Sequence, residues 1–198
     1  MSNAPDYSTA TNKAYEILSR VYPFQLETDI FKILSSFSTI VVHTYTEFAQ
    51  KFKMSFEEAL ESVSSEYGFT IRSRRTGKSE IYYNDRKDIC TIKFTLAHEL
   101  GHIVLGHIED DDISRKEASC FARNLLCAVP IIDELNIQTV RDLVYVFEVG
   151  EPMAKVSLNH FNSDRYYIRK NLYNNIREQT YAYMCGCSSV AELYGVYA

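Results

Sequence analysis

Two histidines and a glutamate lie within five residues of one another, in the segment His98-Glu99-Leu100-Gly101-His102. In an α-helix with about 3.6 residues per turn, side chains four positions apart lie one above the other. His98 and His102 could therefore present two imidazole nitrogens to one metal ion. Glu99 would lie beside them, where it could hold and deprotonate a metal-bound water as a general base. The segment predicts a catalytic zinc site.

The sequence around this motif is apolar, which supports the prediction. Apolar side chains cover most of the circumference of the expected helix, as in a helix that the fold buries centrally. Buried polar side chains need partners, and one divalent cation would satisfy all three at once. The alternative is a core helix whose histidines bond to backbone carbonyls and whose Glu99 pairs with an arginine. We favour the metal because the alternative needs separate partners for three clustered groups.

A catalytic zinc ion usually has three protein ligands and an open position for water. The metzincin pattern would place glycine and histidine three and six residues after His102. Leu105 and Ile108 stand there, so that class is excluded. The remaining candidates for the third ligand are His107, the acidic run 109–112 and Glu117. We interpret the acidic run as a solvated turn.

Glu117 is placed by the helix expected to follow the acidic run. Ser114 can cap this helix, and Glu117 is the third residue after it. Glu117 adjoins an apolar stripe at helical spacing, formed by Ala118, Phe121, Ala122 and Leu125. It could then point toward the motif helix, as the glutamate ligand does in gluzincin-type sites. The alternative is a capping-box carboxylate that accepts hydrogen bonds from the start of its own helix.

Two stretches of the chain together resemble a known family. Residues 94–107 read Phe-Thr-Leu-Ala-His-Glu-Leu-Gly-His-Ile-Val-Leu-Gly-His, and residues 117–130 read Glu-Ala-Ser-Cys-Phe-Ala-Arg-Asn-Leu-Leu-Cys-Ala-Val-Pro. They resemble the ImmA/IrrE family of bacterial metallopeptidases, in which an HExxH helix precedes a Glu-Ala-Asn/Asp-x-Phe-Ala-x-x-Leu-Leu-x-Pro helix. The resemblance covers roughly residues 67–160. It implies a mostly helical, zincin-like fold with His98, His102 and Glu117 as zinc ligands.

The chain departs from the family pattern at two places. Ser119 stands where the family usually has Asn or Asp, and Cys127-Ala-Val precedes Pro130 where one or two residues are more usual. Neither change removes a predicted ligand. The change at Ser119 puts in doubt a hydrogen bond that would orient a ligand.

The resemblance also implies a function. The substrate would be a DNA-binding repressor of a mobile element or stress regulon, cleaved so that its target genes are derepressed. Zinc would polarise the scissile carbonyl, while Glu99 would take a proton from water and pass it to the leaving amine. Candidates for the oxyanion-stabilising donor are Tyr82, Tyr83, His107 and His160.

Two other functions compete with this one. The chain could be a non-proteolytic metal-binding module that sequesters a transcription factor or a toxin, although intact ligands and Glu99 favour the enzyme. A structural zinc protein is disfavoured, because such sites are normally closed by four ligands rich in cysteine.

Length and composition predict one domain spanning 1–198, with N-terminal helices over 1–66, a metallopeptidase core over 67–130 and a helical extension over 131–198. The net charge of −5 argues against direct nucleic-acid binding. The sequence has no apolar run of the ~18 residues that span a bilayer, and its first residues lack the features of a signal peptide. Its five cysteines indicate reduced thiols. We therefore expect a cytoplasmic protein without a membrane partner; the oligomeric state is not fixed by the sequence.

The pattern along the chain predicts an α+β fold with a small sheet beside the motif helix. Strands are expected at 39–45, 69–72 and 80–83, the last two joined by a basic turn. An edge strand near the zinc could bind an extended substrate by strand addition. Helices are expected at 8–22, 28–37, from the capping box at Ser55 to Gly68, at 139–147 and at 153–161. The last two helices resemble a helix-turn-helix. Residues 138–161 contain two basic and three acidic side chains, which disfavours DNA binding. We therefore interpret this pair as a lid or interaction surface.

Overall fold

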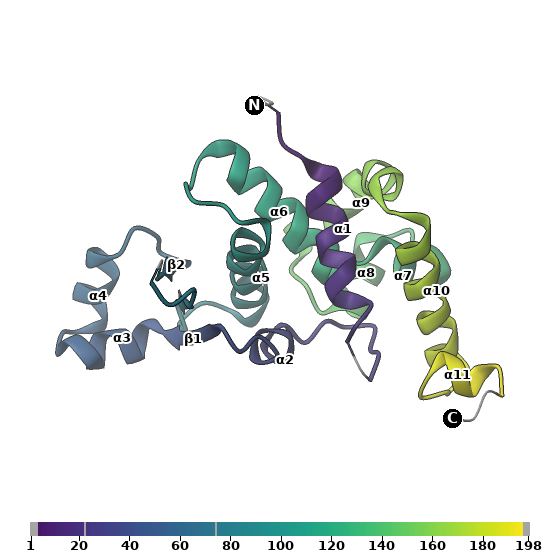
Figure 1. Cartoon of the computed structure of the whole chain (residues 1–198), viewed down its shortest axis with the longest axis horizontal. Coiled ribbons are helices and arrows are strands. Elements are labelled where there is room, and N and C mark those ends of the chain that lie inside the picture. Colours follow the sequence, from purple (N-terminus) through teal and green to yellow (C-terminus); the bar gives the residue numbers. More distant parts are fainter. Residues whose placement is uncertain (1–3, 22, 74, 196–198) are drawn as a thin grey trace.

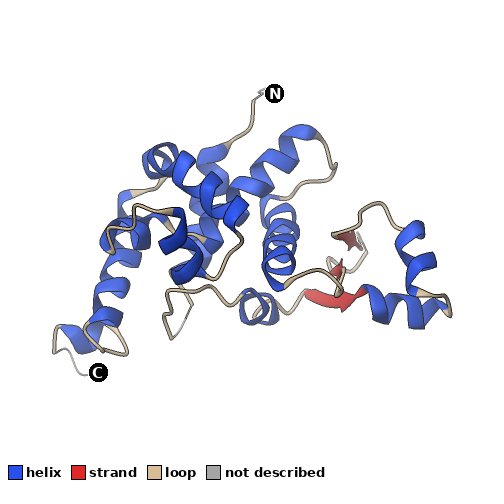
Figure 2. Cartoon of the chain, turned by 180° about the vertical axis from the view of Figure 1, so that it is seen from behind, coloured by secondary structure: helices blue, strands red, loops and turns tan. Residues whose placement is uncertain are grey.

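A computed structural model of the chain describes residues 4–21, 23–73 and 75–195. Two helices lie at the centre of the molecule, α5 (Ile89–Leu105) and α6 (Asp112–Leu126), and α1 (Tyr7–Leu18) packs on α6 (Figure 1). The sheet lies on one side of α5 and the C-terminal helices lie on the other (Figure 2). Tyr22 and Arg74, which belong to the predicted first helix and basic turn, lie outside the described residues.

The sheet has three short strands, β1 (Ile40–Thr44), β2 (Gly68–Arg72) and β3 (Ser79–Tyr83), in the order β1-β3-β2. β1 runs parallel to β3, and β2 runs antiparallel to it. β2 is therefore an edge strand. The structure confirms the predicted mostly helical α+β fold with a small sheet beside the motif helix.

Three short helices precede or flank the sheet: α2 (Ile30–Ser35), α3 (Tyr45–Phe52) and α4 (Phe56–Ser62). α3 was not expected, although Thr44 and Glu47 form a capping box at its start. The predicted helix from Ser55 to Gly68 is too long. α4 ends at Ser62 because Val63 has an extended backbone, with φ −102° and ψ 159°. Gly68 instead begins β2, where an added Cβ would lie only 2.5 Å from Thr95 Cγ2.

The described C-terminal part is mostly helical and includes the helices predicted at 139–147 and 153–161. It comprises α7 (Val129–Glu134), α8 (Val140–Phe147), α9 (Glu151–Tyr167), α10 (Lys170–Met184) and α11 (Val190–Leu193). α9 continues to Tyr167 instead of ending at Phe161. In the described part of the chain, every helix is too short or too polar to cross a bilayer.

The core joins α1, α5 and α6. Gly101 on α5 faces Ala118 on α6, and a Cβ at Gly101 would lie 3.1 Å from Ala118 Cα. This glycine lets the two backbones approach closely. Apolar side chains fill the remaining space between the three helices, among them Ala10, Ala14, Tyr15, Leu96, Leu100, Phe121 and Leu125.

Candidate metal centre

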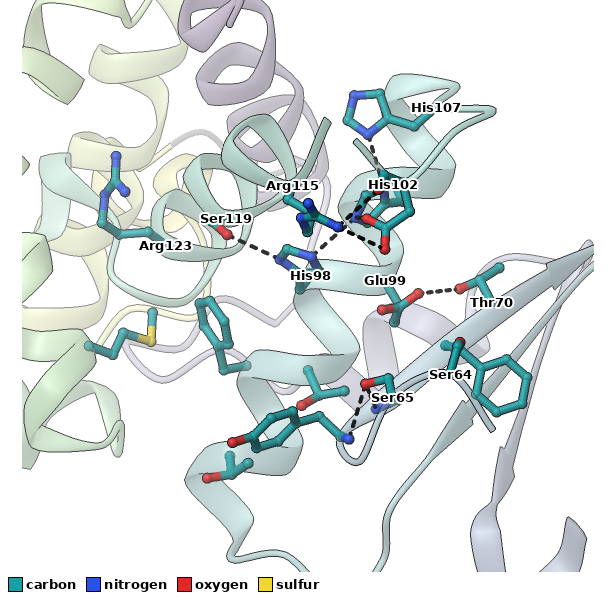
Figure 3. A pocket seen from close by; sticks show the side chains of 18 of the residues that line it. Ser64, Ser65, Thr70, His98, Glu99, His102, His107, Arg115, Ser119 and Arg123 are labelled. Carbon is teal, nitrogen blue, oxygen red and sulfur yellow. Dashed lines mark hydrogen bonds and ion pairs between the residues drawn. The ribbon is translucent and has the colours of Figure 1, made fainter. Parts of the chain in front are cut away.

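The motif residues lie in one long helix, as their spacing predicts. The Asp88 side chain caps the start of α5 by accepting a hydrogen bond from the Thr91 N–H, and the helix ends at Gly106, whose φ is +73°. His98 and His102 point to the same side, with their Nε2 atoms 3.1 Å apart (Figure 3). Two nitrogens bound to one tetrahedral zinc ion, each at about 2.0–2.1 Å, would lie roughly 3.3 Å apart. The pair is therefore spaced to share one metal ion.

The second ring nitrogen of each histidine has a partner of its own. His98 Nδ1 lies 3.3 Å from Ser119 Oγ, and His102 Nδ1 lies 3.1 Å from His107 Nδ1. His107 Nε2 lies 2.8 Å from Glu117 Oε2. Since a carboxylate only accepts hydrogen bonds, His107 Nε2 carries a proton and, in the neutral ring, its Nδ1 accepts one from His102. His102 Nε2 then keeps its lone pair for a metal.

Burial keeps both motif histidines neutral. It lowers the pKa of His98 and the pKa of His102 to about 4, and the neighbouring imidazoles add to the effect. Metal binding requires the neutral imidazole. Both side chains are therefore in the protonation state of a ligand at neutral pH.

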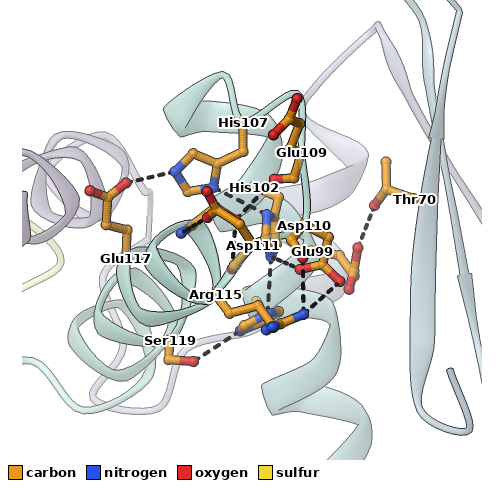
Figure 4. Close-up of polar contacts among 12 residues, drawn as sticks. Thr70, Glu99, His102, His107, Glu109, Asp110, Asp111, Arg115, Glu117 and Ser119 are labelled. Atoms are coloured by element: carbon orange, nitrogen blue, oxygen red, sulfur yellow. Dashed lines mark hydrogen bonds and ion pairs between the residues drawn. The ribbon is translucent and has the colours of Figure 1, made fainter. Parts of the chain in front are cut away.

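Glu117 does not lie with His98 and His102. Its Oε2 atom contacts His107, and its Oε1 atom accepts a hydrogen bond of 2.6 Å from the Asp6 N–H. Figure 4 shows Glu117 and Glu99 on opposite sides of His102. In this structure Glu117 therefore contacts His107 and the Asp6 N–H, and its role as third zinc ligand stays a prediction.

Glu117 is not a capping-box residue either. α6 begins at Asp112, three residues before the start that a Ser114 cap would give, and the Asp111 carboxylate accepts from the Ser114 N–H at 2.7 Å. Glu117 therefore lies in the second turn of α6, beyond the free backbone donors of the helix start. The capping-box interpretation of Glu117 therefore differs from its observed contacts.

A third ligand is not preassembled beside the histidine pair. Within the described ranges, no three His, Cys, Asp or Glu side chains are gathered closely enough to hold a metal ion. The nearest carboxylate on the Nε2 side belongs to Asp110, whose Oδ1 atom lies 3.9 Å from His102 Nε2. The site fits zinc through the spacing of its two nitrogens, and it leaves the third position to a side chain that must move.

Glu99 lies on the open side of the histidine pair, toward the sheet. Its Oε2 atom accepts a hydrogen bond of 2.7 Å from the Thr70 hydroxyl on β2. Burial raises the pKa of Glu99, and the Thr70 hydrogen bond partly offsets this rise. A carboxylate with a raised pKa is a better proton acceptor and donor near neutral pH.

These residues line a large cleft between β2 and α9, with a volume of about 1270 Å³. One wall follows β2 from Gly68 to Arg72, and Figure 3 shows Thr70 of this wall bonded to Glu99. The opposite wall is largely apolar and includes Phe94, Met153 and Val156. The cleft can hold an extended segment of polypeptide along the edge strand.

The predicted oxyanion donors are mostly distant from the cleft. Tyr82 is buried and donates its hydroxyl hydrogen to Glu80 at 2.7 Å. Tyr83 and His160 do not line the cleft, and His107 is held by His102 and Glu117.

Three arginines that the sequence did not assign to the site line the cleft, Arg72 on β2 and Arg115 and Arg123 on α6. Arg72 donates to the His107 carbonyl oxygen at 2.6 Å, and Arg115 pairs with Asp110. Only the alternation of β2 could have indicated Arg72, which shares a face of the strand with Thr70.

Comparison with known families supports the assignment of the central part of the chain. Residues 62–159 match the model of peptidase family M78, described as the IrrE N-terminal-like domain. The matched segment contains β2, β3, α5 and α6, and thus the histidine pair, Glu99 and the cleft wall. No curated protein and no solved structure matches the chain.

Proposed function

The chain belongs to the IrrE N-terminal-like family of peptidases, and we propose that it is a zinc-dependent endopeptidase. The observation that carries this proposal is the 3.1 Å approach of His98 Nε2 to His102 Nε2, with Glu99 beside them in the cleft. His98 and His102 would hold the metal, with Glu117 as the third ligand that the family resemblance implies, and Glu99 would act as general base.

In the proposed reaction, the bound metal, Glu99 and Thr70 would each have a separate role. A bound zinc ion would supply Lewis acidity and lower the pKa of a water toward about 7. Glu99 would accept the proton of that water and deliver it to the leaving amine. Thr70 fixes the Glu99 carboxylate, so the base is already oriented before substrate enters.

The substrate we propose is a DNA-binding repressor protein, whose cleavage would derepress genes of a mobile element or stress regulon. Support for this class comes from the family resemblance. For the mode of binding, we propose that an extended segment of the repressor pairs with the edge of β2 and passes the histidine pair; the edge position of β2 and the cleft beside it support this.

The test is the Glu99→Gln variant, incubated with the repressor encoded by the neighbouring gene and followed by mass analysis of the fragments. Glutamine keeps the shape of the side chain but cannot take a proton. Cleavage should fall by about 10²–10⁴-fold while bound zinc is retained. Glu61→Gln, an exposed change outside the cleft, is the control and should cleave as the unmodified chain does. An unchanged rate in Glu99→Gln would remove the mechanism.

The same incubation tests the rival function, a non-proteolytic module that sequesters a transcription factor or a toxin. An intact repressor recovered in a stable complex would favour that module. The position of Glu99 favours the peptidase, because a buried carboxylate beside two metal-facing nitrogens is not needed for sequestration.

A further inference from the structure

We propose that Phe94, Met153 and Val156 form a subsite for a large apolar side chain of the substrate, at a residue next to the cleaved bond. This inference rests on the proposed function, because it adds a specificity site to the same cleft. The substrate would then carry leucine, methionine or phenylalanine beside the bond that is hydrolysed.

The subsite lies next to the histidine pair, on the side away from β2. Phe94 is one helical turn before His98 on α5, and their ring centroids are 6.0 Å apart. Figure 3 shows Ser119 and Arg123 on the side of His98 opposite to Thr70, and all of these residues line the cleft. The cleft therefore continues past His98 toward α6, and a side chain held there would belong to a residue close to the metal position.

α9 supplies the other half of the subsite. Met153 and Val156 are three residues apart, so they lie on the same face of the helix, and both line the cleft. Val156 is 44 % exposed although it is apolar, and Phe94 and Met153 are only partly buried against the core. Apolar side chains gathered in a cleft beside reactive groups are typical of a ligand site. An apolar side chain of the substrate would remove this surface from water.

Two charged residues also line the cleft, Arg123 and Asp88, and both already have partners within the fold. The Arg123 guanidinium is paired with Asp164 through two contacts of 2.8 Å. The Asp88 carboxylate accepts hydrogen bonds from the hydroxyl and the N–H of Thr91. A charged substrate side chain would gain no ion pair from these two groups and would lose its hydration. An apolar side chain is therefore the better occupant.

α9 is fixed at two points, so the subsite is formed before the substrate binds. Just before the start of α9, the Cys90 thiol donates to the Glu148 carbonyl oxygen at 3.7 Å, and Lys93 lies 3.5 Å from the Glu148 carboxylate. Further along, the pair of Arg123 with Asp164 joins α9 to α6. Binding then needs little ordering of the cleft, which favours affinity for a matching side chain.

The proposed pairing with β2 explains why such a subsite would decide where the chain is cut. Successive side chains of an extended segment point to opposite sides. Main-chain hydrogen bonds to an edge strand supply affinity, whereas pockets for alternate side chains supply specificity. The subsite would select one residue of the segment and so fix the position of its peptide bonds relative to Glu99.

The experiment uses pools of peptides with a glycine, alanine and serine background. One position holds Leu or Phe, and matched pools hold Asp or Lys there. The zinc-loaded chain is incubated with each pool, and the fragments are identified by mass spectrometry. The Leu and Phe pools should be cleaved about 10–100-fold faster than the matched pools, with the apolar residue at a constant place beside the cleaved bond.

Val156→Lys tests the assignment of this preference to the subsite. It should lower the ratio of Leu to Asp cleavage by at least about tenfold, because a lysine in the subsite disfavours an apolar side chain and attracts an acidic one. Tyr166→Lys introduces the same charge at an exposed residue of α9 outside the cleft, and its ratio should stay that of the unmodified chain. Thermal unfolding verifies that both variants are folded.

A second measurement observes the subsite without turnover. The sequence has four methionines, and Met153 is the one assigned to the subsite. In the Glu99→Gln variant labelled with ¹³C-methyl methionine, the Phe pool should shift the Met153 methyl resonance, and the Asp pool should leave it in place. Met153→Leu identifies that resonance by its loss.

The results distinguish failure of this inference from failure of the proposed function. The subsite is overturned if cleavage shows no apolar preference, if Val156→Lys keeps the preference, or if the Met153 resonance does not respond to the Phe pool. If no pool is cleaved while the Met153 resonance responds to the Phe pool and not to the Asp pool, the apolar subsite is supported and the peptidase function fails.

Discussion

Arg123 on α6 and Asp164 on α9 form a two-pronged ion pair, with the Nε–Oδ2 and Nη2–Oδ1 distances both 2.8 Å. The side chains are only 11 % and 4 % exposed. Removing one partner would leave a buried charge without compensation, which typically costs about 3–5 kcal/mol. Asp164→Ala should therefore lower the free energy of unfolding by that amount, as measured by urea denaturation.

The control for this prediction lies one residue away on α9. Arg165 pairs with Asp133 at 3.1 Å, but its side chain is half exposed. Exposed pairs contribute at most about 1 kcal/mol. If Arg165→Ala destabilises the chain as much as Asp164→Ala does, burial is not the cause of the effect.

Replacing Gly101 by alanine should separate α5 from α6. The added methyl group would lie 3.0 Å from Phe121 Cδ1 and 3.2 Å from the Ala118 carbonyl oxygen. A phenyl ring can shift, but the backbone of α6 cannot move without disturbing the core. We expect a net loss of about 1–2 kcal/mol, because overpacking outweighs the better helix propensity of alanine. A thermal midpoint equal to that of the unmodified chain would show that the interface is looser than its geometry indicates.

Ser119 should contribute to metal affinity through His98. Its hydroxyl oxygen lies 3.3 Å from His98 Nδ1, the nitrogen that does not face the metal. Ser119→Ala should weaken zinc binding by about 10-fold, since it removes the partner that orients this ring. Ser119→Asp should restore or improve it, because a carboxylate is a stronger acceptor. Ser163→Ala, on an exposed part of α9, is the control in the same chelator competition.

Acid should destabilise the start of α5. The Asp88 carboxylate accepts hydrogen bonds from the Thr91 hydroxyl and the Thr91 N–H, at 2.6 and 3.0 Å. These bonds hold the pKa of Asp88 below its usual value. A group whose pKa is lower in the folded state stabilises the fold above its unfolded pKa of about 4, and this contribution is lost as pH falls through the folded value.

The Asp88→Asn variant tests this account. Asparagine is a good cap that does not titrate. The loss of thermal stability between pH 5 and pH 3 should therefore be smaller in Asp88→Asn than in the unmodified chain. Identical pH profiles would mean that other carboxylates account for the whole acid sensitivity.

The local parts of the site were predictable because they depend on helical spacing. His98, Glu99 and His102 belong to one helix, so their relative positions follow from the four-residue interval. The orientation of α6 was not predictable in the same way. Its apolar stripe faces α5, but Glu117 flanks that stripe on one side, and Arg115 and Ser119 flank it on the other. Helical periodicity does not indicate which flank of the stripe lies against His98. In the structure it is the flank that carries Ser119.

Outside the site too, features set by local sequence were predictable and features set by tertiary contacts were not. The strands were predicted within one or two residues because their β-branched and aromatic runs are bounded by polar turns. The helix after Ser55 was extended too far, because Val63 and Tyr67 fit helical spacing while the chain already turns toward β2. Tertiary pairing with β3 decides the conformation there, and a local pattern does not contain that information.

The hydrogen bond from the Asp6 N–H to Glu117 has a consequence for mutagenesis. The main chain of Asp6 contacts Glu117, which in turn contacts His107. The Asp6 carboxylate separately caps α1 by accepting a hydrogen bond from the Thr9 N–H. Alanine scanning removes only the second contact. A scan would therefore identify Asp6 only as a helix cap and would miss its contact with Glu117. Replacing the backbone amide of Asp6 by an ester would test that contact, because it removes the N–H donor.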